Sequence, residues 1–152
     1  MTRNTQHATR NTQHVLRVPC CVKGGDMDER VASAVRERAP EGTLRCAEAF
    51  RIAEELGVTP GMVGETADTL DVRLTHCQLG LFGYGERKSV VEPAAEVTPE
   101  VEQAIREGLI LDRLPCAVAW AIAVRFHVPK LHVANAAERL GVRIGQCQLG
   151  AF

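Results

Sequence analysis

The apolar positions of this chain follow a pattern that occurs twice. Residues 28–82 and 98–152 align without a gap at an offset of 70, and 21 of the aligned positions are identical. The identities include apolar pairs such as Leu44 with Leu114, and the segment Cys-Gln-Leu-Gly at 77–80 returns at 147–150. Chance does not give an ungapped match of this length. We therefore treat residues 28–82 as a first unit and residues 98–152 as a second unit of the same kind.

The spacing of apolar residues within each unit predicts three helices and a strand. The helices are expected at 28–38, 44–56 and 60–70, and again at 99–108, 115–126 and 129–140, where Thr98 and Pro99 suit a helix start. The segments 72–79 and 142–149 start with the alternation of apolar and polar residues that is typical of a strand. Before each Cys the apolar residues shift by one position to the other face, which a bulge or burial on both faces would explain. The expected fold class is mainly α: two tandem three-helix units, each ending in a short β-strand and related by a pseudo-twofold. We expect the strands of the two units to meet in a small sheet.

The segments outside the two units differ in composition. Residues 1–27 carry a direct repeat of seven mostly polar residues, with too few apolar positions for a coiled coil, so we expect a disordered polar tail. We hypothesise that this tail is not part of the natural protein, which would start at Met27; N-terminal mass spectrometry that finds peptides from residues 1–26 would contradict this. Residues 83–97 contain Gly83, Gly85 and Pro93 and are expected to form a linker.

Composition excludes several classes of protein. The longest uncharged apolar run, at 116–124, is far shorter than the roughly 20 residues of a membrane span, and the polar start of the chain does not resemble a secretory signal. We therefore expect a soluble, cytoplasmic protein that does not associate with membranes. The six Cys residues are expected to be free thiols in that reducing compartment.

A helix-turn-helix pattern is present in both units. Ile52-Ala-x-x-Leu-Gly-Val58 followed by Val63 resembles the helix-turn-helix of bacterial regulators, in which a small Ala lets two helices approach and Gly forms the turn. The second unit matches with Ile122-Ala-x-x-Phe-His-Val128 and Val133, but His127 replaces the turn Gly. The resemblance covers about residues 46–72 and 116–142. It implies the helix-turn-helix fold, without assigning a specific family.

DNA binding would depend on the second unit. Residues 112–152 carry five basic and two acidic side chains, whereas residues 42–82 carry three basic and six acidic ones. Asn and Arg make the usual contacts to adenine and guanine, so Asn135 and Arg139 are the candidates for base contacts. The complete set of predicted DNA-binding residues is Arg125, Lys130, His132, Asn135, Arg139 and Arg143. The leading hypothesis is therefore a DNA-binding protein similar to transcriptional regulators, although the same charges could simply solvate a helix.

The alternative hypothesis is a non-enzymatic module that binds a protein or a metal ion and whose helix-turn-helix units are structural. The Cys residues of the two units lie 31, 39 and 31 positions apart, unlike the closely paired ligands of zinc sites, so no metal site is expected. Cys77 and Cys147 remain candidates because a pseudo-twofold could bring them together. No catalytic motif and no cofactor loop is recognisable, so we expect neither an enzyme nor a cofactor.

A homodimer is also conceivable from the pattern of the second unit. Val118, Ala121 and Val124 replace Glu48, Arg51 and Glu54 of the first unit and follow each other at helical spacing along one side. We therefore expect this side to be covered in the second unit, either by another part of the chain or by a second copy of it.

Overall fold

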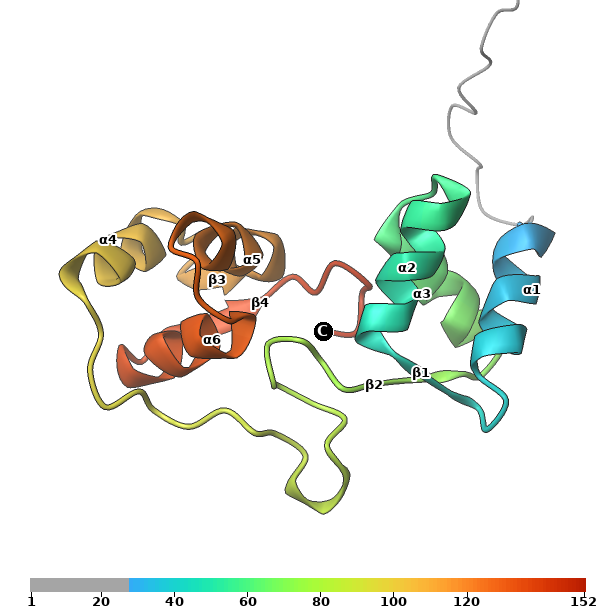
Figure 1. Ribbon diagram of the computed structural model, residues 1–152, viewed down its shortest axis with the longest axis horizontal. Helices are drawn as coiled ribbons and strands as arrows, with labels where there is room; N and C mark the ends of the chain where they lie inside the picture. The colour runs from blue at the N-terminus through green and yellow to red at the C-terminus, as the bar shows by residue number, and fades with distance from the viewer. Residues whose placement is uncertain (1–27) are drawn as a thin grey trace, which may run out of the picture.

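The structure is a computed structural model that describes residues 28–152, so the predicted tail at 1–27 lies outside the described residues. It is mainly helical, and the order helix, strand, helix, helix, strand occurs twice. Figure 1 shows the two groups of helices side by side, with the C-terminus of the chain between them. The first group contains α1 (Glu29–Arg38), β1 (Thr43–Arg45), α2 (Cys46–Leu56), α3 (Pro60–Thr69) and β2 (Arg73–Thr75). The second contains α4 (Pro99–Glu107), β3 (Arg113–Pro115), α5 (Cys116–Arg125), α6 (Lys130–Arg139) and β4 (Arg143–Gly145).

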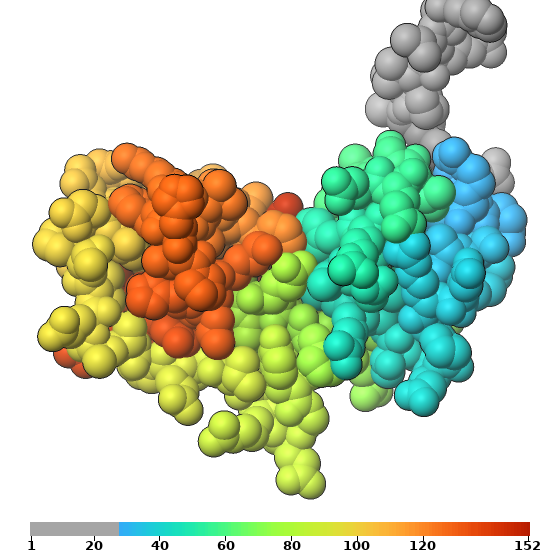
Figure 2. Space-filling view, viewed as in Figure 1, coloured from blue at the N-terminus to red at the C-terminus, as the bar shows by residue number. Residues whose placement is uncertain are grey.

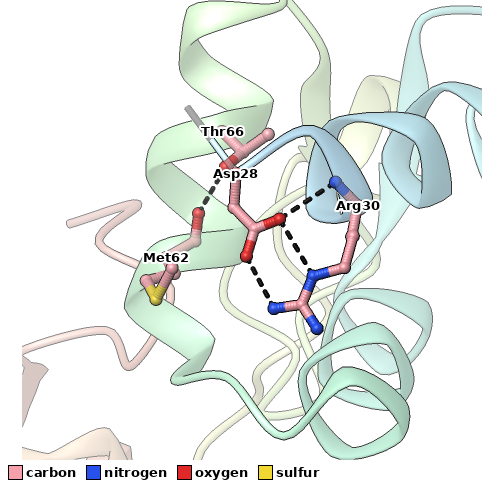
Figure 3. A network of polar contacts seen from close by, with 4 residues as sticks. All are labelled: Asp28, Arg30, Met62 and Thr66. Atoms are coloured by element: carbon pink, nitrogen blue, oxygen red, sulfur yellow. Dashed lines mark hydrogen bonds and ion pairs between the residues drawn. The ribbon is translucent and has the colours of Figure 1, made fainter. Parts of the chain in front are cut away.

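The six helices confirm the predicted helical segments to within two residues at each end. Local signals explain where they begin. Asp28 caps α1 by accepting the backbone N–H of Arg30 at 2.9 Å, and its carboxylate also pairs with the Arg30 guanidinium (Figure 3). Thr98 occupies the predicted N-cap of α4, but its side chain makes no capping hydrogen bond. Within residues 28–152, no helix is long and apolar enough to cross a membrane.

The turns between α2 and α3 and between α5 and α6 have the same backbone geometry. Gly57 has a φ of 63° and His127 a φ of 52°, so His127 adopts the left-handed conformation that Gly adopts more easily. In each turn the next residue closes the helix end: the N–H of Val58 donates to the carbonyl of Ala53 at 2.9 Å, and Val128 makes the equivalent bond at 3.0 Å. The replacement of Gly by His therefore leaves the turn unchanged, at a modest cost in backbone strain.

The prediction of a sheet between the two units is wrong. β2 pairs in parallel with β1 of its own unit, and β4 pairs in parallel with β3, so two separate two-stranded sheets form. β1 and β3 were not predicted, because they directly precede α2 and α5 and part of each was assigned to the expected helices at 44–56 and 115–126. Parallel neighbours require a crossover connection, and the two helices between β1 and β2 provide it within the same unit.

The change of parity after each strand has a different cause from the expected bulge. His76 and Gln146, which follow β2 and β4 directly, have positive φ values of 50° and 49°, so the chain turns out of the strand at each of them. The Cys-Gln-Leu-Gly segments that follow then leave their own units. Leu79 is fully buried in the core formed by α4, α5 and α6, whereas Leu149 is buried in the core formed by α1, α2 and α3. The two units thus exchange their final apolar residues, and we call 77–80 and 147–150 the exchanged segments.

Close backbone contacts accompany this exchange. A Cβ on Gly64 of α3 would lie 1.8 Å from the carbonyl oxygen of Leu149, so a residue without a side chain is required there. On the other side, a Cβ on Gly80 would lie 2.6 Å from Leu131 of α6. The connection from β2 to α4 has no helix longer than the single 3₁₀ turn Gly85–Arg87, and in the space-filling view its green and yellow-green residues fill space between the two lobes (Figure 2).

We expect Gly64→Ala to lower the free energy of unfolding by roughly 1–3 kcal/mol, because the new methyl group would displace the backbone of Leu149. Gly61→Ala is the matched control in the same helix, since its Cβ would have no neighbour closer than 3.8 Å. Urea unfolding of both variants measures the difference. Equal stabilities would mean that Leu149 does not pack against α3.

Candidate functional site

An aromatic pair lies at the junction of the two units. The rings of Phe50 in α2 and Trp120 in α5 are 4.4 Å apart between centroids and tilted by 39°. The Lys130 ammonium lies 4.1 Å from the centroid of the Trp120 ring and donates a hydrogen bond of 3.0 Å to Oε1 of Gln78. Lys130 therefore connects α6 with the exchanged segment of the first unit. These contacts join parts of the chain that lie far apart in the sequence.

The four Cys residues of the two units also lie at this junction. Cys77 is buried in the same apolar cluster as Cys116, and Cys147 packs against the cluster that contains Cys46. Gln78 and Gln148, which follow Cys77 and Cys147 in the sequence, instead contact a Cys of their own unit. Nε2 of Gln78 is 3.8 Å from Sγ of Cys46, and Nε2 of Gln148 is 3.5 Å from Sγ of Cys116. Each exchanged segment thus passes between one Cys of its own unit and one Cys of the other.

The electrostatics of these thiols reflect burial and mutual proximity. Burial raises the pKa of Cys46 to about 11, and the neighbouring Cys77 and Cys147 add to this increase. Burial likewise raises the pKa values of Cys77 and Cys116, with further contributions from Cys147 in both cases. The thiols of Cys46, Cys77 and Cys116 are therefore protonated at neutral pH. Among residues 28–152, no three His, Cys, Asp or Glu side chains already stand close enough together to hold a metal ion.

The residues predicted to contact DNA differ in how accessible they are. Arg125, His132, Arg139 and Arg143 are exposed, whereas Lys130 and Asn135 are partly buried. No ion pair between residues 28 and 152 involves any of the three arginines. They come from different elements, since Arg125 ends α5, Arg139 ends α6 and Arg143 begins β4. Lys130 is already engaged by Trp120 and Gln78.

Asn135 is held by the connection between the units. Its Oδ1 accepts the N–H of Glu92 at 3.0 Å, and its backbone carbonyl accepts the N–H of Ala94 at 3.0 Å. His132, Asn135 and Arg139 follow each other at i, i+3 and i+7 and share one face of α6. The connection therefore crosses the middle of the face that would enter a major groove, and it brings the carboxylate of Glu92 to the same region.

The face proposed for a homodimer is partly open. Ala121 is exposed and Val124 has 72% of its surface exposed, so these positions are not covered within one chain. Val118 is partly buried and lies against Gly108, where a Cβ would come within 2.6 Å of it. The homodimer stays a prediction.

Sequence reasoning missed the aromatic pair and the two Gln residues as members of the junction. The repeat could have indicated both, because an aromatic residue occurs at position 50 and at the equivalent position 120, and Gln78 has its equivalent in Gln148. Comparison of the chain with family models, with curated proteins and with solved structures found no match. Its function is therefore inferred from the residues described above.

We expect Lys130→Met to lower the free energy of unfolding by about 1 kcal/mol, because it removes the contact with the Trp120 ring and the hydrogen bond to Gln78. The control is Arg125→Met, whose exposed guanidinium lies 5.2 Å from the Phe126 ring and should matter by less than about 0.5 kcal/mol. Urea unfolding monitored by the fluorescence of Trp120 reports both. A Lys130 variant as stable as the control would show that Lys130 is not a structural contact.

Proposed function

We propose that this chain is a non-enzymatic binding module in which the two helix-turn-helix units are structural, and that the thiols at the junction bind a thiophilic metal ion such as Zn²⁺. One observation supports this most: the four Cys residues shared by the two units lie where the exchanged segments pass between the cores. The sequence spacing alone did not indicate a site, because the four Cys residues reach the same junction only through the packing of one unit on the other.

An approximate twofold between the units is part of this proposal, and two pairs of aromatic rings support it. Phe50 contacts Trp120, and the Phe82 and Phe152 rings are 6.0 Å apart between centroids. The members of each pair are 70 positions apart, so each pair consists of equivalent residues of the two units. Equivalent residues related by a twofold can contact each other only close to its axis. Cys77 and Cys147 are also 70 positions apart, and Cys147 adds to the raised pKa of Cys77, which supports a position of both close to the same proposed axis.

The helices that would read DNA are used for packing instead. Gly64 of α3 faces the backbone of Leu149, and Leu131 of α6 faces Gly80. Asn135 is occupied by the connection between the units. A helix-turn-helix whose second helix is engaged in this way serves as a packing unit, which favours a structural role for both copies.

The chemistry of the junction suits a soft metal ion. Thiolates are preferred ligands of Zn²⁺, which takes four of them in a closed structural site. Cys46, Cys77, Cys116 and Cys147 would be the ligands, and binding would require their side chains to turn toward one another and to lose their protons. A bound ion would then connect both cores through both exchanged segments.

We expect protein purified without oxygen to contain a thiophilic metal ion, and metal-free protein to bind Co²⁺ with the thiolate charge-transfer absorption of a Cys site. Cys147→Ser should lower the Co²⁺ affinity by at least about 100-fold, because one thiolate ligand is lost. The combined substitution Cys20→Ser and Cys21→Ser is the control, since these thiols lie outside the two units. Absence of the absorption band in the wild-type protein, or its loss in the control, would contradict the proposal.

DNA binding is the second candidate, because three exposed arginines of the second unit have no ion-pair partner among residues 28–152. Such guanidinium groups could contact phosphates without the face of α6 that the connection covers. Binding would then be independent of sequence, in contrast to a regulator that reads bases through Asn135.

If this second function is correct, affinity for a mixed-sequence duplex should fall roughly 40-fold between about 50 and about 200 mM salt, as expected when three phosphates are neutralised by the three arginines. Arg143→Ala should weaken binding and reduce the salt dependence. Arg73→Ala, at the equivalent position of the first unit, should leave both unchanged. Fluorescence anisotropy measures these affinities, and no binding at low salt would rule out this function.

A further inference from the structure

A cavity of about 870 Å³ lies where the two units meet, within the size range of sites for small molecules. Its walls are largely apolar and come from both units: Leu74, Leu81, Phe82, Ile144 and Phe152. These side chains are partly buried apart from Phe152, which exposes 45% of its surface. Leu74 with Ile144 and Phe82 with Phe152 are equivalent pairs, so the cavity lies at the same junction as the aromatic pair and the thiols. An apolar surface of this kind is available to the apolar part of a ligand.

The charged groups of the cavity are two arginines and one aspartate. Arg73 from β2 and Arg113 from β3 contribute guanidinium groups, and Asp68 from α3 contributes a carboxylate. All three are exposed, and none of them takes part in an ion pair between residues 28 and 152. The excess of one positive charge favours a single anionic group on the ligand. It disfavours polyphosphates, whose additional charges would face Asp68.

The position of Arg113 is set by the backbone of the neighbouring strand. A Cβ on Gly145 of β4 would lie 3.1 Å from Cδ of Arg113 and 3.4 Å from its Cβ, so the stem of Arg113 crosses the strand where no side chain stands. In the first unit the equivalents of Arg113 and Gly145 are Thr43 and Thr75. Only the second unit therefore combines an arginine with a glycine on the neighbouring strand. Because Gly145 has no side chain, the stem of Arg113 can extend over it along the cavity.

From this combination we infer that the cavity binds a small amphipathic monoanion, an aromatic or aliphatic carboxylate or sulfonate. The apolar body contacts Phe82, Phe152 and the neighbouring aliphatic side chains, and the anionic group pairs with Arg73 and Arg113. This site is separate from the proposed metal ligands and does not depend on a metal ion, since none of the cavity residues is a Cys.

The test uses two matched fluorescent probes, the anion 8-anilinonaphthalene-1-sulfonate and its neutral relative N-phenyl-1-naphthylamine. The wild-type chain should bind the anion saturably at one site. Arg113→Ala should weaken its binding about tenfold, because one charge-assisted contact is lost, and Arg73→Ala should act similarly. Both variants should bind the neutral probe as the wild-type protein does, since the apolar walls are intact.

Two further variants separate this site from unspecific binding. Arg143→Ala is the control for Arg73→Ala, because it removes the equivalent arginine, which does not line the cavity, and should leave binding of the anion unchanged. Ala151→Trp places a large side chain in the cavity at an exposed position and should weaken both probes. Circular dichroism and thermal unfolding check that each variant is folded. Binding without saturation, an equal effect of Arg143→Ala and Arg73→Ala, or no effect of Ala151→Trp would each overturn the inference.

Discussion

The burial of Leu79 and Leu149 in each other's units is the interaction on which the rest of this structure depends. A Leu side chain taken out of water contributes about 1.5–3 kcal/mol, and here each contribution is obtained only while both units are present. Each core is small, being made of three short helices with a two-stranded sheet at its edge. Two units of about 55 residues that each lack one core residue complete each other, and this makes the junction a fixed part of the fold.

The same exchange determines which surfaces are free. To reach the other core, the segment 147–150 approaches α3 so closely that Gly64 is required, and Gly80 meets Leu131 of α6. The connection between the units then crosses Asn135 on its way to α4. The second helix of each predicted helix-turn-helix is therefore a packing surface. Arg125, Arg139 and Arg143, which lie at the ends of elements, stay exposed, as does His132 of α6.

The junction gathers chemistry that no single unit contains. On one part of it, the exchanged segments bring Cys77 and the partly buried Cys147 to the junction with Cys46 and Cys116, and burial raises the pKa of Cys46, Cys77 and Cys116. On another, an apolar cavity carries two guanidinium groups. Both consist of residues from the two units, so both proposed sites would exist only in the assembled chain. The Cys and Gln residues of the junction occur at equivalent positions of both units, whereas the charges of the two units differ.

The sequence alone determined the local structure of this protein. Apolar spacing located six helices to within two residues, and the repeat at an offset of 70 indicated the order of elements in both units, because these features depend on neighbours in the chain. The tertiary structure decided the pairing of the strands and the exchange of the final segments. The strands β1 and β3 run directly into α2 and α5, so the local pattern did not separate them from those helices. The left-handed residues His76 and Gln146, which send Leu79 and Leu149 into the other core, are not marked by glycine. Whether Asn135 and Lys130 are free to bind a partner was likewise decided by contacts with residues about 40 and 50 positions away, which local pattern cannot show.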